Sequence, residues 1–340
     1  MKTFGIYTLG NDGVYDQVIA LLNSIERNVG QDIPVCIIPF DNRMQKLEKA
    51  IADRPQVTIF DNAASIARWD RFAEEVWAAH SQSAAVNFRS VPKWYKQCQL
   101  LRKMSAFDGE FEQFVFYDAD SLAMQPLDDV IAKLQTHDFV FDDWEHQKQT
   151  DVAALKFDLI EAELGLSEAE VRPQIHCSSF FGGHRDYFSP RVLRELKQRL
   201  VEDDEINWIN DLAFWCDADL FSYITLRLEA TVWNYTLSPV GRDRTGNTAE
   251  ARYVNRDQVL YNEEGVKPIR RLHYITHSAA RFRQLCRGEV VELPQQELFL
   301  YYRFLHEPER CPKVFRVPSW VQLRSRSMSS KVKKLQQLIA

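Results

Sequence analysis

Residues 114–122 read Phe-Val-Phe-Tyr-Asp-Ala-Asp-Ser-Leu, an apolar aromatic run that ends in two carboxylates one residue apart. Such a run predicts a buried strand. Open α/β sheets bind ligands at the carboxyl ends of their strands, which is where Asp118 and Asp120 would lie. Two close carboxylates repel each other unless a positive charge stands between them. A divalent metal that carries a diphosphate supplies such a charge, because hard cations prefer oxygen ligands.

The Asp-x-Asp pattern is weak by itself, since an Asp after a strand often forms a turn or caps a helix. The chain holds a second copy at Asp217-Ala218-Asp219. That copy follows Phe214-Trp215-Cys216, which has no β-branched residue, so we expect a helix end or a loop there rather than a site. The apolar strand before Asp118 distinguishes the first copy.

The flanking sequence predicts an α/β fold. Strand-like runs alternate with helical spacing over residues 4–60, which indicates a β-α-β-α-β unit and a parallel sheet. Further strands are expected at residues 139–141, 224–228, 231–235 and 269–275, and helices at 63–108, 150–172, 191–201 and 209–216. We expect one α/β domain over residues 1–285 and a helical extension with a basic tail over residues 286–340.

Composition limits the classes of function. The 340 residues are 45% hydrophobic, which is enough for a large core, and the net charge of −6 argues against general nucleic-acid binding. Six cysteines without a Cys-x-x-Cys pair are typical of a reducing compartment. The first residues lack the apolar core of a signal peptide, and no apolar stretch approaches the ~20 residues of a spanning helix, so we expect a cytoplasmic protein.

The C-terminal end has a different charge balance. Residues 311–340 contain seven Lys or Arg and no Asp or Glu, and apolar residues are interspersed among the basic ones. A basic face beside an apolar face is typical of peripheral contact with an anionic membrane surface, here the inner face. A solvated end without a partner is the alternative.

The order of motifs resembles the GT-A glycosyltransferases, in particular glycosyltransferase family 8 and its bacterial relatives. The resemblance covers roughly residues 1–280, and residues 114–130 are its most specific part. It is carried by the N-terminal βαβ unit, by residues 114–123, and by Lys93 and Lys96, Gln125-Pro126-Leu127-Asp128-Asp129-Val130, Ser178 to Gly183, Asn210 to Ala213, Trp233-Asn234-Tyr235 and Leu272-His273-Tyr274.

This resemblance implies a GT-A-like, Rossmann-type mixed sheet that is mostly parallel and flanked by helices. It implies metal-dependent transfer of a hexose, with retention, from a nucleotide-diphosphate sugar to an acceptor that is a saccharide, a lipid or a protein. The metal would be Mn²⁺ or Mg²⁺, and an imidazole ligand favours Mn²⁺.

The same resemblance implies roles for individual residues. The metal ligands would be Asp118, Asp120 and His273, and Asp118 could hold the ribose instead. Lys96 would reach the donor phosphates, and Asp211 would hold hydroxyls of the donor sugar. The remaining donor contacts would be Ser178 near the sugar and Tyr7, Thr8 and Asn11 around the base and ribose. Without the resemblance, His273 reads as a core histidine and Asp211 as a helix cap.

One departure leaves alternatives open. The family pattern His-x-x-Gly-x-x-Lys is absent after His273, and His277 or Arg281 are the candidates for the missing diphosphate contact. A first alternative is therefore a protein that binds nucleotide sugars without transferring them. A second is a Mg²⁺-dependent phosphatase with Asp118 as nucleophile. Some 110 residues precede the motif and Asp142-Asp143 follows it too soon, which disfavours the phosphatase.

Overall fold

The computed structural model describes residues 2–81, 83, 99–210, 217–237, 248–263, 265–266 and 268–318. At its centre is a seven-stranded sheet of order β3-β2-β1-β4-β7-β6-β8. The strands are β1 (Lys2–Gly10), β2 (Val35–Pro39), β3 (Val57–Ile59), β4 (Phe111–Asp118), β6 (Phe139–Phe141), β7 (Phe180–His184) and β8 (Val232–Asn234). Only β7 runs against its neighbours β4 and β6, and the other pairs are parallel. The predicted mixed, mostly parallel α/β sheet is confirmed.

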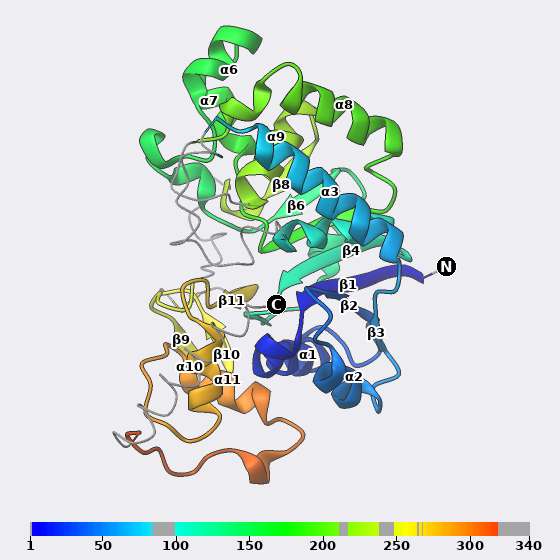
Figure 1. Ribbon diagram of the computed structural model, residues 1–340. Coiled ribbons are helices and arrows are strands. Elements are labelled where there is room, and N and C mark those ends of the chain that lie inside the picture. The colour runs from blue at the N-terminus through cyan, green and yellow to red at the C-terminus, as the bar shows by residue number, and fades with distance from the viewer. Residues whose placement is uncertain are drawn as a thin grey trace.

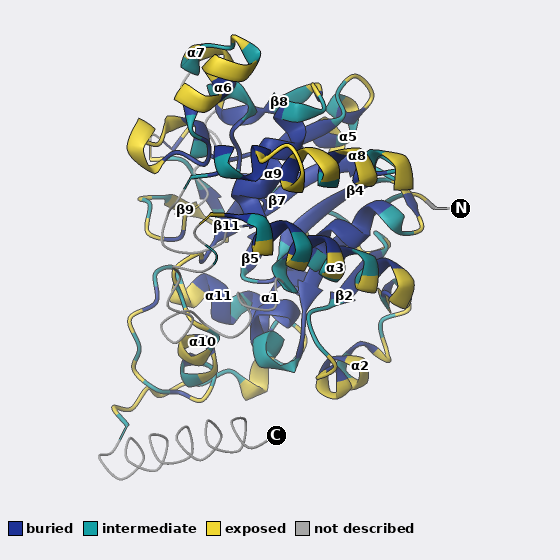
Figure 2. Ribbon diagram, turned by 45° about the horizontal axis from the view of Figure 1, so that its top comes forward, coloured by how far each residue is buried: buried dark blue, intermediate teal, exposed yellow. Residues whose placement is uncertain are grey.

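Helices cover both faces of this sheet (Figure 1). One face packs against α3 (Ala63–Ala79), η2 (Gln99–Asp108), α8 (Pro190–Val201) and α9 (Asp217–Arg227). The other face packs against α1 (Tyr15–Asn28), α2 (Gln45–Ile51) and α5 (Asp128–Leu134). Strand β4 serves both layers, because Phe114 and Phe116 point to the first and Val115 and Tyr117 to the second. Figure 2 shows the strands buried between helices whose outer faces are exposed.

Two small antiparallel pairs extend the fold at one end. Strand β5 (Ser121–Ala123) pairs with β11 (Arg271–His273), and β9 (Val254–Arg256) pairs with β10 (Val259–Tyr261). Helices α10 (Ala279–Leu285) and α11 (Gln296–Arg303) lie beside them and next to α1 (Figure 1). A third core cluster joins Ala20 of α1 and Leu122 of β5 to apolar residues of α10 and α11. The predicted domain boundary at residue 285 stays a prediction.

Several predicted elements differ in detail. The strand expected at residues 224–228 is wrong, because α9 extends to Arg227. Leu220, Phe221 and Ile224 are buried at helical spacing there, and this packing outweighs the strand preference of the β-branched residues. The helix expected at 209–216 falls mostly on residues 211–216, outside the described residues, and Ile209 makes a β-bridge with Leu155.

The remaining elements are α6 (Phe157–Leu164) and α7 (Glu168–Val171), with short 3-10 turns between the others. The strand expected at 231–235 is confirmed as β8, and the one at 269–275 as β11, although β11 belongs to the small β5 pair. Among the described residues, no helix combines the length and the apolar character that crossing a membrane requires.

Candidate functional site

The candidate site lies at the carboxyl edge of the sheet, between β1 and β4. The chain leaves β1, forms β2 and β3 on one side, and returns to form β4 on the other side of β1. This reversal is the position at which open α/β sheets leave a crevice for ligands. Asp118 ends β4 opposite Leu9 of β1. Its backbone N–H donates to the carbonyl oxygen of Ser179 at 2.8 Å, so the residues before antiparallel β7 lie at the same edge.

The pairing of β5 with β11 brings a histidine to this edge from the far part of the chain. β5 begins directly after Asp120, and its first residue, Ser121, lies opposite His273. The backbone N–H of Tyr274 donates to the carbonyl oxygen of Asp120 at 2.9 Å. His273 Nε2 consequently lies 3.3 Å from Asp120 Oδ1.

Asp118, Asp120 and His273 form a compact set of metal-ligand atoms. One ligand atom from each lies within 4.8 Å of the others. The His273 ring is 5% exposed, whereas the side chains of Asp118 and Asp120 are 27% and 25% exposed. The two carboxylates are therefore accessible at the edge of the sheet, whereas the imidazole is almost fully buried. Two carboxylates with one imidazole are a donor set that suits Mn²⁺ or Mg²⁺, so the residues fit the expected ion.

The two carboxylates differ electrostatically. Burial raises the pKa of Asp118, and the opposing attraction of Lys103 is not enough to reverse this. Burial also raises the pKa of Asp120, but the neighbouring imidazole of His273 outweighs this effect, so the pKa of that carboxyl is lowered. A cation bound between the two would favour the ionised form of both.

Lys103 is a site residue that the sequence interpretation missed. It lies in η2, its side chain is 2% exposed, and its Nζ is 3.0 Å from Asp118 Oδ1 and 2.7 Å from Asp217 Oδ2. Nζ also lies 3.2 Å from both Oγ and the carbonyl oxygen of Ser178. The Ser178 hydroxyl donates in turn to Asp217. Lys103, Asp118, Ser178 and Asp217 thus form one polar network, which shares Asp118 with the candidate metal ligands.

The charges in this network stabilise one another. Burial lowers the pKa of Lys103, but the adjacent Asp118 and Asp217 outweigh it and hold that pKa above its usual range. Burial raises the pKa of Asp217, and Lys103 with Ser178 more than reverses this, so the pKa of Asp217 is lowered. The site therefore keeps a permanent ammonium next to the carboxylates.

Asp217 is the second residue that was missed, since the second Asp-x-Asp copy was predicted to lie outside any site. The structure places it at the start of α9, where an acidic residue is also favoured by the helix dipole. A sequence signal existed for Lys103: it stands three residues after Leu100 and four before Phe107, so at helical spacing it shares a face with apolar residues, where an unpaired lysine would be costly to bury.

The other predicted donor contacts have different outcomes. Lys96 and Asp211 lie outside the described residues. Ser178 lies in the buried network, and Thr8 and Asn11 lie at or near the carboxyl end of β1. Thr8 is fully buried, and its Oγ1 has no hydrogen-bond partner among the described residues. Asn11 caps the turn η1 (Asp12–Val14) by accepting from the N–H of Gly13 at 2.8 Å.

The prediction for Tyr7 is corrected. Its ring is fully buried and packs against Phe111 and Phe114. Its hydroxyl accepts from the backbone N–H of Glu110 at 2.9 Å, and Glu110 precedes β4, at the end of the sheet opposite Asp118. Tyr7 is therefore a core residue that points away from the site.

The substitutes proposed for the missing Gly and Lys make contacts of their own. His277 Nε2 lies 2.8 Å from Glu250 Oε1, and Arg281 contacts Nδ1 of His277 at 3.2 Å. Asp142 and Asp143 follow β6 at the same carboxyl edge as Asp118. Burial raises the pKa of Asp143 to about 7.

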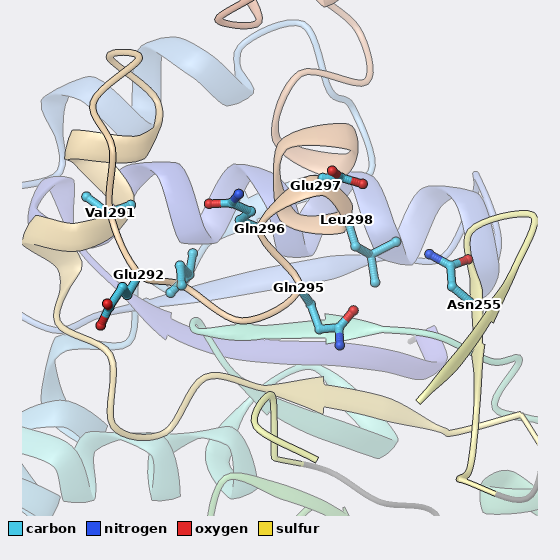
Figure 3. A pocket seen from close by; sticks show the side chains of 8 residues that line it. Asn255, Val291, Glu292, Gln295, Gln296, Glu297 and Leu298 are labelled. Carbon is cyan, nitrogen blue, oxygen red and sulfur yellow. The ribbon is translucent and has the colours of Figure 1, made fainter. Parts of the chain in front are cut away.

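A surface pocket lies elsewhere. It has a volume of about 380 Å³ and lies between β9 and the start of α11 (Figure 3). It is lined by Asn255, Val291, Glu292, Leu293, Gln295, Gln296, Glu297 and Leu298. None of these residues belongs to the set around Asp118. Glu292 and Glu297 make the pocket unsuitable for an anion.

Comparisons with known proteins gave matches in structure alone. No family model matches the chain, and no curated protein matches it in sequence. Mouse xyloside xylosyltransferase 1 in its apo form matches with 11% identity and a TM-score of 0.47, covering 71% of this chain and 90% of that one. Galactosyltransferase LgtC in complex with donor and acceptor sugar analogues matches with 12% identity and a TM-score of 0.46, covering 86% and 98%.

A third match is the Mn/GDP form of core-mannan synthase A from Aspergillus fumigatus, with 9% identity and a TM-score of 0.41, covering 66% of this chain and 70% of that one. These three solved structures are glycosyltransferases.

Proposed function

We propose that this protein is a metal-dependent glycosyltransferase of the GT-A type that moves a hexose from a nucleotide-diphosphate sugar to a saccharide, lipid or protein acceptor. The observation that carries the proposal is the set Asp118, Asp120 and His273. Its ligand atoms lie within 4.8 Å of one another at the carboxyl edge of the sheet, where the strand order reverses between β1 and β4. Retention of configuration is part of the proposal through the family resemblance alone.

In this function, Asp118, Asp120 and His273 would hold Mn²⁺ or Mg²⁺. When bound, such an ion supplies positive charge to the diphosphate as the sugar–oxygen bond breaks. A carboxylate has two oxygens, so Asp118 can contact Lys103 through Oδ1 and a metal through the other. Lys103 holds a further positive charge close to this position without moving, because Asp217 and Ser178 fix its ammonium. Such preorganised charge is effective because it needs no rearrangement during the reaction.

The protein's remaining residues would bind and orient the donor. Asn11 lies just beyond the carboxyl end of β1, on the side of the crevice where we place the base and ribose, and Thr8 lies buried beneath it in β1. Ser178 and Asp217 border the crevice on the β7 side, where we place the sugar. Asp211 and Lys96 keep their proposed roles toward the sugar hydroxyls and the phosphates.

A thermal-shift screen with UDP-, GDP- and CDP-linked sugars, each with and without Mn²⁺, tests this function. A ligand that binds only the native state raises the melting temperature, so one nucleotide is expected to raise it strongly when Mn²⁺ is present and weakly without it. The same donor should then be consumed in the presence of acceptor or water. Binding without turnover would support the binding protein that transfers nothing, and no shift with any nucleotide would contradict the proposal.

We also propose that the C-terminal tail attaches the protein to the inner face of a membrane. The last described residues carry exposed apolar side chains, and Val317 is 78% exposed. Residues 319–340 follow with five Lys or Arg and no acid. The protein should sediment with phosphatidylglycerol vesicles at low salt and not with phosphatidylcholine vesicles. Replacing Arg324, Arg326, Lys331, Lys333 and Lys334 by glutamine should abolish this; retained binding would contradict it.

A further inference from the structure

The turn that follows β1 is fastened to the neighbouring strand connection. Asn11 Nδ2 donates to Asp41 Oδ2 at 2.9 Å. The carboxylate of Asp12 accepts from the backbone N–H groups of Lys46 and Leu47 at 3.0 Å each, which caps the start of α2. The residues after β1 are thereby held to the β2–α2 side of the crevice.

The same turn is fastened on its other side by the C-terminal helices. Arg283 of α10 donates from Nη1 to the carbonyl oxygen of Gly13 at 2.6 Å. Arg303, at the end of α11, donates from Nε to Asp16 Oδ1 at 2.8 Å, and the two side chains are 6% and 11% exposed. The Arg303 guanidinium also lies 5.3 Å from the ring centre of Tyr15. Two arginines from the last quarter of the described chain thus hold residues 13–16.

Buried polar residues on α1 account for the position of α11. Asn23 Nδ2 donates to the carbonyl oxygen of Tyr302 at 2.7 Å, and Asn28 Nδ2 donates to the Tyr302 hydroxyl at 2.8 Å. Asp16 and Asn23 are buried, and buried polar groups are costly unless they are paired. The side of α1 that carries them is built to receive α11, which sets Arg303 over the start of α1.

We propose that Arg283 and Arg303 are positioning residues for the nucleotide of the donor. They hold the β1–α1 turn in one conformation at the edge of the crevice beside Asp118, although neither is placed in contact with the donor. This role rests on the proposed function. A turn that is already ordered loses less entropy when the nucleotide binds, so the contacts raise affinity without entering the reaction.

Titration of UDP, GDP and CDP, each with Mn²⁺, into the wild type and into Arg283→Gln and Arg303→Gln proteins tests this role. We expect the Kd of the nucleotide that the wild type binds to rise about tenfold, since this corresponds to ~1.4 kcal/mol, close to the cost of ordering one side chain. KM for the donor should rise in parallel while kcat changes little. The Kd for Mn²⁺ alone should not change, because the two arginines contact the turn at Gly13 and Asp16 and not the metal ligands. Arg283→Lys keeps a donor and should restore most of the affinity.

Tyr302→Phe is the matched control. It removes a contact between the same two helices, but at Asn28, near the end of α1 farthest from the turn. It should lower the melting temperature and leave the nucleotide Kd unchanged. If the wild type binds a nucleotide and both arginine variants bind it equally well, or if Tyr302→Phe weakens binding as much as they do, the positioning role is overturned. If the wild type binds none of UDP, GDP and CDP, the proposed function is overturned and this role with it.

Discussion

The Asp120→Asn protein is expected to keep its fold and to lose metal-dependent donor turnover by ~10²–10³-fold, the size of loss seen when one electrostatic stabiliser is removed from an active site. Asp120 contacts His273 through Oδ1, and an amide in its place is a far poorer ligand for a hard cation. Asp118→Asn should behave similarly. Turnover is measured at saturating Mn²⁺, and Mn²⁺ affinity by titration.

Asp128→Asn provides the control. It removes the same charge from an exposed position in the first turn of α5, close in sequence to the motif. Its turnover and Mn²⁺ affinity should match those of the wild type. An Asp120→Asn protein with undiminished turnover would count decisively against the metal site.

Lys103→Met is expected to have the largest effect on stability. The substitution leaves Asp118 and Asp217 close together and partly or fully buried without their common cation. Breaking a buried pair in this way costs about 3–5 kcal/mol in the free energy of unfolding. Urea denaturation at pH 7 measures this loss. Lys197→Met is the control, since Lys197 pairs with Glu75 at 2.7 Å on the surface, where such pairs contribute about 0–1 kcal/mol.

The loss of stability in Lys103→Met should become smaller as the pH is lowered. In the wild type the folded pKa of Asp217 is lowered, so its stabilising contribution is present above the ordinary value of 3.8 and disappears as the pH falls through the folded value. Lys103 has a raised pKa, so its contribution persists until the pH rises through that raised value. In Lys103→Met, the two acids can take up protons as the pH is lowered from 7 toward 5. The deficit relative to the wild type should therefore shrink in acid, and a constant deficit would contradict the paired-charge explanation.

The sequence predicted those parts of the fold and of the site that leave a local pattern of apolar residues or a family resemblance. The run ending at Asp118 predicted a buried strand because Phe114 to Tyr117 are all apolar or aromatic, and the structure confirms the strand and shows that its side chains alternate between two packed layers. His273 was selected by resemblance, and β5–β11 pairing brings it to Asp120. The pairing itself could not be predicted, because both strands have three residues and each lacks a distinctive pattern.

Lys103 and Asp217 were missed for a different reason. Helical spacing shows which residues share a face of a helix, but not which side chain that face meets across the core. Two charged residues that would each be unfavourable when buried become favourable only as a pair, and they are over a hundred residues apart. Tyr7 was assigned to the donor by resemblance to the family, which gives a position in the strand but not the direction of the side chain, and its hydroxyl bonds to Glu110 at the opposite end of the sheet.

His273, Arg283 and Arg303 all come late in the sequence, and this order has a consequence for biosynthesis. When the ribosome has completed the seven-stranded sheet, through Asn234, it has not yet added His273, the third proposed metal ligand. It has also not yet added Arg283 and Arg303, which contact the β1–α1 turn. Nascent chains that end between Asn234 and Arg303 would thus contain all seven strands but lack part of the proposed site. We therefore expect chains that end before Arg303 to bind the proposed donor more weakly than the full-length protein does.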